Sequence, residues 1–216
     1  MDGLNFALNV AASIVAGVLL LVFTGWLSDR ARWVLTATLG RLLNIDVEYV
    51  FRNSQHADED IKRELQRASS ISLLSGRGNE LQRGTFAVVL QPSVGQTERK
   101  LRILLPAVRV QAGEKEWTVE REREIASFDH AFGSGVLRQQ IETTTKFLEQ
   151  HVKAKHLELR FFNAPHLGRV LLTEHYAFLT LYRKNAHGRD CRVTKYRRGG
   201  DMYDALERLF EQLWAA

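Results

Sequence analysis

The residues that could bind an anion occur in three short segments of this sequence. The first pairs two glycines with an arginine at Gly76-Arg77-Gly78, the second contains Arg109, and the third contains His166. Glycine lets a backbone approach a ligand closely, and a guanidinium group binds oxyanions through paired donors. Phosphate is the simplest group that such residues recognise. We therefore predict a ligand-binding cleft formed by nine residues: Ser75, Gly76, Arg77, Gly78, Asn79, Arg109, Asn163, His166 and Arg169.

The three segments follow predicted strands, which would bring them together. The hydrophobic pattern predicts strands over 70–74, 100–105 and 157–162, and a helix over 80–90. The carboxyl ends of parallel strands share one edge of a sheet, and a helix that starts there offers free amide groups to an anion. Two plainer interpretations stay open. The glycine segment is also typical of an ordinary turn with an exposed arginine, and His166 of a surface turn.

The remaining periodicity predicts the rest of an α/β domain. Further strands are expected over 47–51, 169–172, 176–182 and 192–196. Helices are expected from Asp58, between Ile125 and Val152 with a break at Gly133-Ser134-Gly135, and from Asp201 to the end. Strands that alternate with helices and then cluster favour a mixed sheet covered by helices on both faces.

The first part of the chain has a different composition. No charged side chain occurs between Asp2 and Asp29, a length sufficient for a helix to cross a hydrocarbon core of ~30 Å. We therefore expect a transmembrane helix over 1–28, an amphipathic neck over 29–45 and an α/β domain over 46–216. Arginine after the apolar run favours a single-pass protein in a bacterial inner membrane, with the N-terminus outside and the domain cytoplasmic.

Charge and small residues indicate possible partners besides the lipid bilayer. Ala12 and Ala16 lie four residues apart, as do Ser13 and Gly17, which favours a homo-oligomer through close helix packing. The chain has a net charge of +5, with a basic cluster before the C-terminal helix. That cluster could meet nucleic acid or lipid headgroups, although a solvated surface is the plainer interpretation. It consists of Arg183, Lys184, Arg189, Arg192, Lys195, Arg197 and Arg198.

The order of elements resembles one half of a phospholipase D-like fold. The motif of that family, His-x-Lys-x4-Asp, would fall between Ala164 and Glu174, but neither register is intact. With Arg169 as the lysine, Leu167 takes the place of the nucleophile; with His166 as the nucleophile, Gly168 and Thr173 take the other two places. The resemblance implies a fold that retains phosphate binding without hydrolysis. The histidines show no metal spacing, and no cofactor is predicted.

Three functions follow as hypotheses. The first is a membrane effector whose domain binds a nucleotide-like ligand and signals to an oligomeric transmembrane helix, a layout shared with bacterial antiviral defence effectors. The second is a membrane-tethered phosphodiesterase or nuclease that uses His166 as its nucleophile. The third is a non-catalytic membrane adaptor. The broken motif favours a protein that is not an enzyme.

Overall fold

The computed structural model describes residues 2–27, 34, 38–40, 46–82, 84–90 and 99–216. The chain divides into two compact units, Met1–Tyr49 and Val50–Ala216. Most of the predicted amphipathic neck over 29–45 lies outside the described residues.

The first unit contains helix α1, Asp2–Leu27, whose side chains are described for residues 9–23 and are exposed there. A helix needs about 20 consecutive, mainly apolar residues to cross a bilayer. No helix among the described residues is long and apolar enough for that. The predicted transmembrane helix over 1–28 is therefore wrong. The predicted single-pass topology and inner-membrane localisation depended on that helix, so they are wrong as well.

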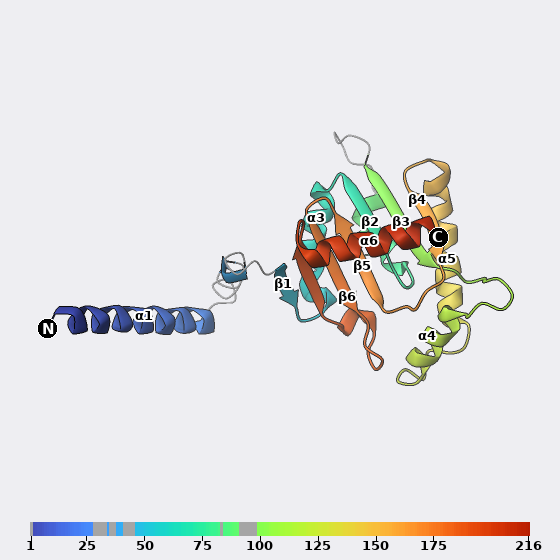
Figure 1. Cartoon of the computed structure of the whole chain (residues 1–216). Coiled ribbons are helices and arrows are strands. Elements are labelled where there is room, and N and C mark those ends of the chain that lie inside the picture. The colour runs from blue at the N-terminus through green and yellow to red at the C-terminus, as the bar shows by residue number, and fades with distance from the viewer. Residues whose placement is uncertain (1, 28–33, 35–37, 41–45, 83, 91–98) are drawn as a thin grey trace. The chain divides into compact units, whose positions relative to one another are not determined.

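The chain forms a mixed, seven-stranded sheet in the order β1-β7-β6-β5-β2-β3-β4, and strands β2 to β7 lie wholly within the second unit (Figure 1). Strands β2, β3 and β4 are parallel, whereas β5 is antiparallel to β2 and β6 is antiparallel to β5 and β7. The strands are β1 Val47–Phe51, β2 Ser70–Leu74, β3 Lys100–Pro106, β4 Glu158–Phe162, β5 Gly168–Thr173, β6 Tyr176–Leu181 and β7 Val193–Arg197.

These directions place several strand ends at one edge of the sheet. The carboxyl ends of β2, β3 and β4 lie there together with the start of β5, because Leu74 pairs with Leu104 on one side and with Val170 on the other. Gly168, at the start of β5, pairs with Leu181 at the end of β6. The sequence argument that strand ends meet at one edge therefore holds for this sheet.

Helices cover both faces of the sheet. Helix α6, Asp201–Ala215, packs across one face, where Tyr203 donates a hydrogen bond to the Thr173 carbonyl (Figure 1). On the opposite face, Thr173 Oγ1 donates to Glu64 of α3, Ser54–Arg67. Helix α5, Val136–Lys153, and two short 3-10 helices, η1 Asn79–Leu81 and η2 Thr85–Leu90, are the other elements that position the site.

One predicted helix is absent as such, and one predicted break between helices is present. The predicted helix over 80–90 is replaced by η1 and η2, so no long helix begins after the glycine segment. The break at Gly133-Ser134-Gly135 is present, because α4 spans Trp117–Ala126 and α5 starts after Gly135, whose φ of 86° suits glycine. The second unit is thus a mixed α/β domain. The predicted fold class is wrong because it included a transmembrane helix N-terminal to this domain.

Candidate functional site

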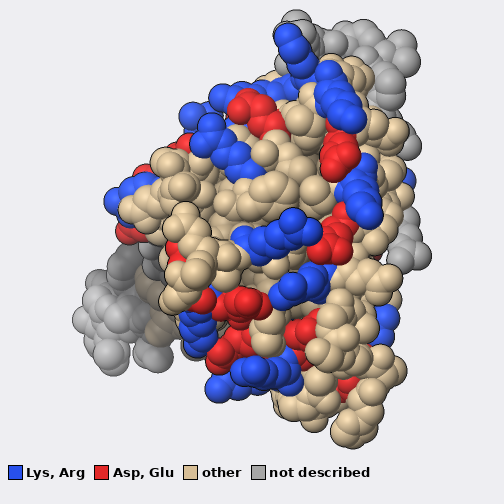
Figure 2. All heavy atoms as spheres, turned by 90° about the vertical axis from the view of Figure 1, so that its right-hand side faces the viewer, with Lys and Arg blue, Asp and Glu red and all other residues tan. Residues whose placement is uncertain are grey.

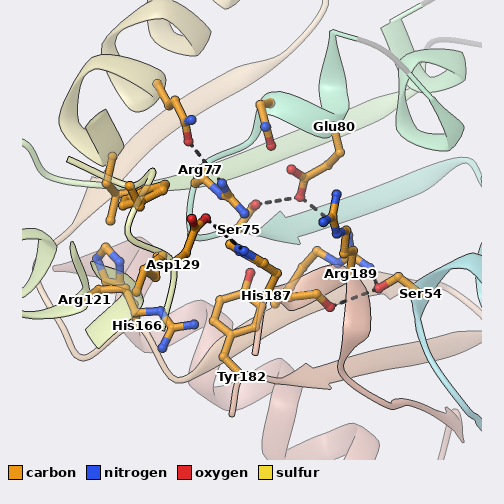
Figure 3. A pocket seen from close by; sticks show the side chains of 18 residues that line it. Ser54, Ser75, Arg77, Glu80, Arg121, Asp129, His166, Tyr182, His187 and Arg189 are labelled. Atoms are coloured by element: carbon orange, nitrogen blue, oxygen red, sulfur yellow. Dashed lines mark hydrogen bonds and ion pairs between the residues drawn. The ribbon is translucent and has the colours of Figure 1, made fainter. Parts of the chain in front are cut away.

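A cavity of about 470 Å³ opens at the edge of the sheet where the strand ends meet (Figure 3). Its floor comes from the turn after β2, the segment before β5 and the residues after β6. Its walls come from α4, α5 and their connection, and from 3-10 helix η3, Gly188–Asp190, between β6 and β7. The volume lies within the range of ~300–1,000 Å³ that is typical of small-molecule sites.

The cavity gathers six of the nine predicted site residues: Ser75, Gly76, Arg77, Asn79, His166 and Arg169. Gly78 shapes the same turn at a φ of 68°, where a Cβ would lie 2.7 Å from Leu105. The other two residues are exposed and do not line the cavity. Arg109 lies in the loop after β3, and the Asn163 amide donates a hydrogen bond to Glu114.

The side chain of Ser75 stabilises the glycine turn. Its Oγ donates to Glu80 at 2.7 Å and accepts from the Gly78 amide at 3.1 Å. Because both contacts are local, the Ser75 hydroxyl is already used by the fold. Two short 3-10 helices replace the predicted helix over 80–90, so the turn is not followed by a long helix whose dipole would attract an anion. Anion binding here therefore depends mainly on side chains.

Arg169 is a fixed cation on the floor of the cavity. Its guanidinium lies 3.6 Å from Glu80, donates to Ser54 and Thr180, and stands over the ring of Phe86 at 4.8 Å. Such a set of contacts leaves the guanidinium little freedom to follow a ligand. Arg169 therefore contributes positive charge and holds the floor in place.

His166 is the most unusual side chain of the site. It is 8% exposed, and its Nδ1 has no hydrogen-bond partner among the residues that the structure describes. Burial lowers the pKa of His166 to about 4, and the nearby Arg121 cation lowers it as well. The imidazole is therefore neutral at physiological pH, and one of its two ring nitrogens carries the proton.

Tyr182 is fitted between two glycines. A Cβ on Gly76 would lie 3.2 Å from its ring and a Cβ on Gly188 would lie 2.8 Å from it. Burial raises the pKa of the Tyr182 phenol, and the Glu80 carboxylate raises it further, so the hydroxyl keeps its proton. Arg121 covers the ring at 5.2 Å and forms an ion pair with Glu124 at 2.7 Å.

Arg77 differs from the other arginines of the cavity. It is half-buried and donates to the side-chain oxygen of Gln140 at 3.2 Å. Within the described part of the chain, Arg77 has no carboxylate partner. Arg121, Arg169 and Arg189 each have one.

The structure adds residues that the sequence did not assign to this site. Asp129 and His187 face each other from opposite walls, with the carboxylate 3.1 Å from Nε2 (Figure 3). Arg121, Tyr182 and Arg189 also line the cavity. These residues lie in helices or connections with no local motif, so only tertiary contact reveals them. Across the described ranges, no group of three metal-ligating side chains comes together.

Comparisons with known proteins add little. No family model matches the chain, and no curated protein matches it. A solved structure of TrmBL2, described as an archaeal chromatin protein with a novel mode of DNA binding, matches at 15% identity and a TM-score of 0.45. The match covers 96% of this chain and 68% of that one. A likeness at this level supports no conclusion about the fold or function of this chain.

These findings correct the identification made from the sequence. The phospholipase D-like resemblance is wrong, since no family model supports it. At the position of the motif's aspartate, Glu174 has a structural role, because it accepts hydrogen bonds from the Ser69 and Ser70 amides. At the position of the nucleophile, Leu167 is 69% exposed. The predicted likeness to bacterial antiviral defence effectors is also wrong, because it depended on a transmembrane helix that is not found among the described residues. Neither the bilayer nor the homo-oligomer gains support as a partner.

Proposed function

We propose that the α/β domain binds a phosphate-bearing, nucleotide-like ligand in the cavity at the sheet edge. One observation carries the proposal: Arg77, half-buried and with no carboxylate partner among the described residues, lines the same cavity as buried His166, whose Nδ1 also has no hydrogen-bond partner among those residues. The Arg77 guanidinium can donate to an oxygen-rich anion, and so can His166 in the tautomer that carries its proton on Nδ1.

The energetics favour a ligand at this position. A buried nitrogen without a hydrogen-bond partner costs about 1–3 kcal/mol, and a ligand oxygen that accepts a hydrogen bond from Nδ1–H would remove that cost. Hydrogen bonds between a guanidinium and a phosphate are charge-assisted and often bidentate, which adds geometric specificity. The arginines at 121, 169 and 189 already have carboxylate partners, so an anionic ligand would depend on Arg77 for its charge-assisted contact.

A nucleic-acid strand is a weaker candidate for this domain. On the side drawn in Figure 2, which carries α5 and β4, acidic side chains lie between the basic ones. The basic cluster predicted at 183–198 is also divided among separate contacts: Lys195 is buried and paired with Asp60, and Arg189 lines the cavity. Binding to a phosphate backbone depends on a continuous basic stripe.

The proposal is tested by calorimetric titration of the full-length chain with AMP, inorganic phosphate and uncharged adenosine. We expect AMP to bind and to raise the melting temperature, because a ligand of the native state stabilises it. Arg77→Gln should weaken AMP binding by about tenfold or more, the loss expected from one charge-assisted contact.

Arg109→Gln is the matched control, because it removes the same charge from an exposed loop outside the cavity. It should leave the affinity for AMP unchanged. Equal losses in the two variants would mean that only net charge matters, and the proposal would be wrong. Absence of binding by any phosphate-bearing compound in the parent protein would also overturn it.

A further inference from the structure

The cavity has an apolar wall opposite its cationic floor. Ile125 of α4, Phe132 of the α4–α5 connection and Leu137 of α5 all line it, and they are 4%, 7% and 1% exposed. The same three residues form one hydrophobic cluster together with Ile141. This wall is therefore held rigidly by the packing of α4 on α5.

The polar side chain of Gln140 lies between the apolar wall and Arg77. Gln140 follows Leu137 by three residues on α5, so the two side chains lie on neighbouring positions of one helix face. The Gln140 oxygen accepts a hydrogen bond from Arg77, which leaves its NH2 group available to a ligand. Asn79 supplies a second amide side chain to the cavity.

We infer that the ligand is a mononucleotide, bound with its phosphate at Arg77 and His166 and its base against the wall formed by Ile125, Phe132 and Leu137. This rests on the proposed function and narrows the ligand class. An apolar wall contributes nothing to the binding of inorganic phosphate or of a sugar phosphate, whereas a planar heterocycle buries apolar surface against it and presents polar edges to amide groups.

The size of the cavity favours the same class. A volume of about 470 Å³, bounded by the sheet edge on one side and by α4, α5 and η3 on the others, encloses a compact ligand. A nucleic-acid strand instead needs an open groove that follows its backbone. The cationic side and the apolar wall of the cavity together suit a ligand with a phosphate group at one end and a planar base at the other.

The test is calorimetric titration of the full-length chain with AMP, ribose 5-phosphate and inorganic phosphate. We expect AMP to bind at least about tenfold more tightly than ribose 5-phosphate, because only AMP carries the planar adenine base. Phe132→Ala should reduce AMP affinity by about tenfold and leave ribose 5-phosphate affinity unchanged. Phe132→Leu, which keeps an apolar side chain, should fold if the alanine variant does not and should lower the preference for AMP severalfold.

Phe161→Ala is the control, because Phe161 is 46% exposed on β4 and does not line the cavity. It should leave the preference for AMP intact. If ribose 5-phosphate binds as tightly as AMP, or if both Phe132 variants retain the parent's preference, the base subsite is disproved while phosphate binding stands. If neither compound binds, the failure belongs to the proposed function itself.

Discussion

Burial of His166 should make the stability of the protein depend on pH. Its pKa is about 4 in the folded chain and ~6.5 when unfolded, so the folded state binds fewer protons between these values. By linkage, the free energy of unfolding falls as pH decreases from ~6.5 to ~4, by up to about 3 kcal/mol from this group. His166→Gln should remove this part of the pH dependence, as measured by urea denaturation across that range.

His130→Gln serves as the control for this measurement, since the His130 side chain is exposed. It should retain the slope of the parent protein over the same pH range. If His166→Gln retains the parent's slope too, the imidazole is not held neutral by its surroundings.

Helix α6 is held on the sheet by a group of rings and arginines. Trp214 stacks on Phe210 with ring centroids 5.6 Å apart, Arg102 lies over both rings, and Arg160 lies over Trp214 and donates to its carbonyl. Trp214→Ala should therefore lower the free energy of unfolding by about 3–5 kcal/mol, as measured by urea denaturation.

Leu209 lies on the same helix and is 42% exposed, so Leu209→Ala should cost far less, within about 0.5–1 kcal/mol. Similar losses in the two variants would mean that helix propensity, and not the packed ring, stabilises α6. The ligand affinity of both variants should match that of the parent, because neither residue lines the cavity.

At the scale of the whole molecule, the two compact units predict separable behaviour. The sheet and its helices provide a core that lies within Val50–Ala216, and β1 begins at Val47. A fragment over 46–216 should therefore unfold in one cooperative transition, at the melting temperature of the corresponding transition in the full chain. Circular dichroism and calorimetry test this, and a molten fragment without a transition would contradict it.

The sequence alone determined most of the secondary structure of the domain. Alternation predicted β1 and β2 with the observed bounds, and the glycine pair before Asp201 indicated the start of α6. The segment over 80–90 was mispredicted, because it forms two 3-10 turns, with η2 packed against α3 and η1 against η2 and α5, and not one continuous helix. Short apolar runs do not by themselves distinguish these outcomes.

The sequence also brought Arg77, His166 and Arg169 to one place, because strand direction alone sends strand ends to a common edge. The sequence could not show which of the loops at that edge line the cavity. Arg109 and Asn163 follow strands as well but are exposed, whereas Arg121, Asp129 and His187 come from helices and connections that tertiary packing folds over the edge. Local pattern thus determines where a chain crosses the sheet. Only contacts between distant segments decide which side chains are buried together, and so which become a site.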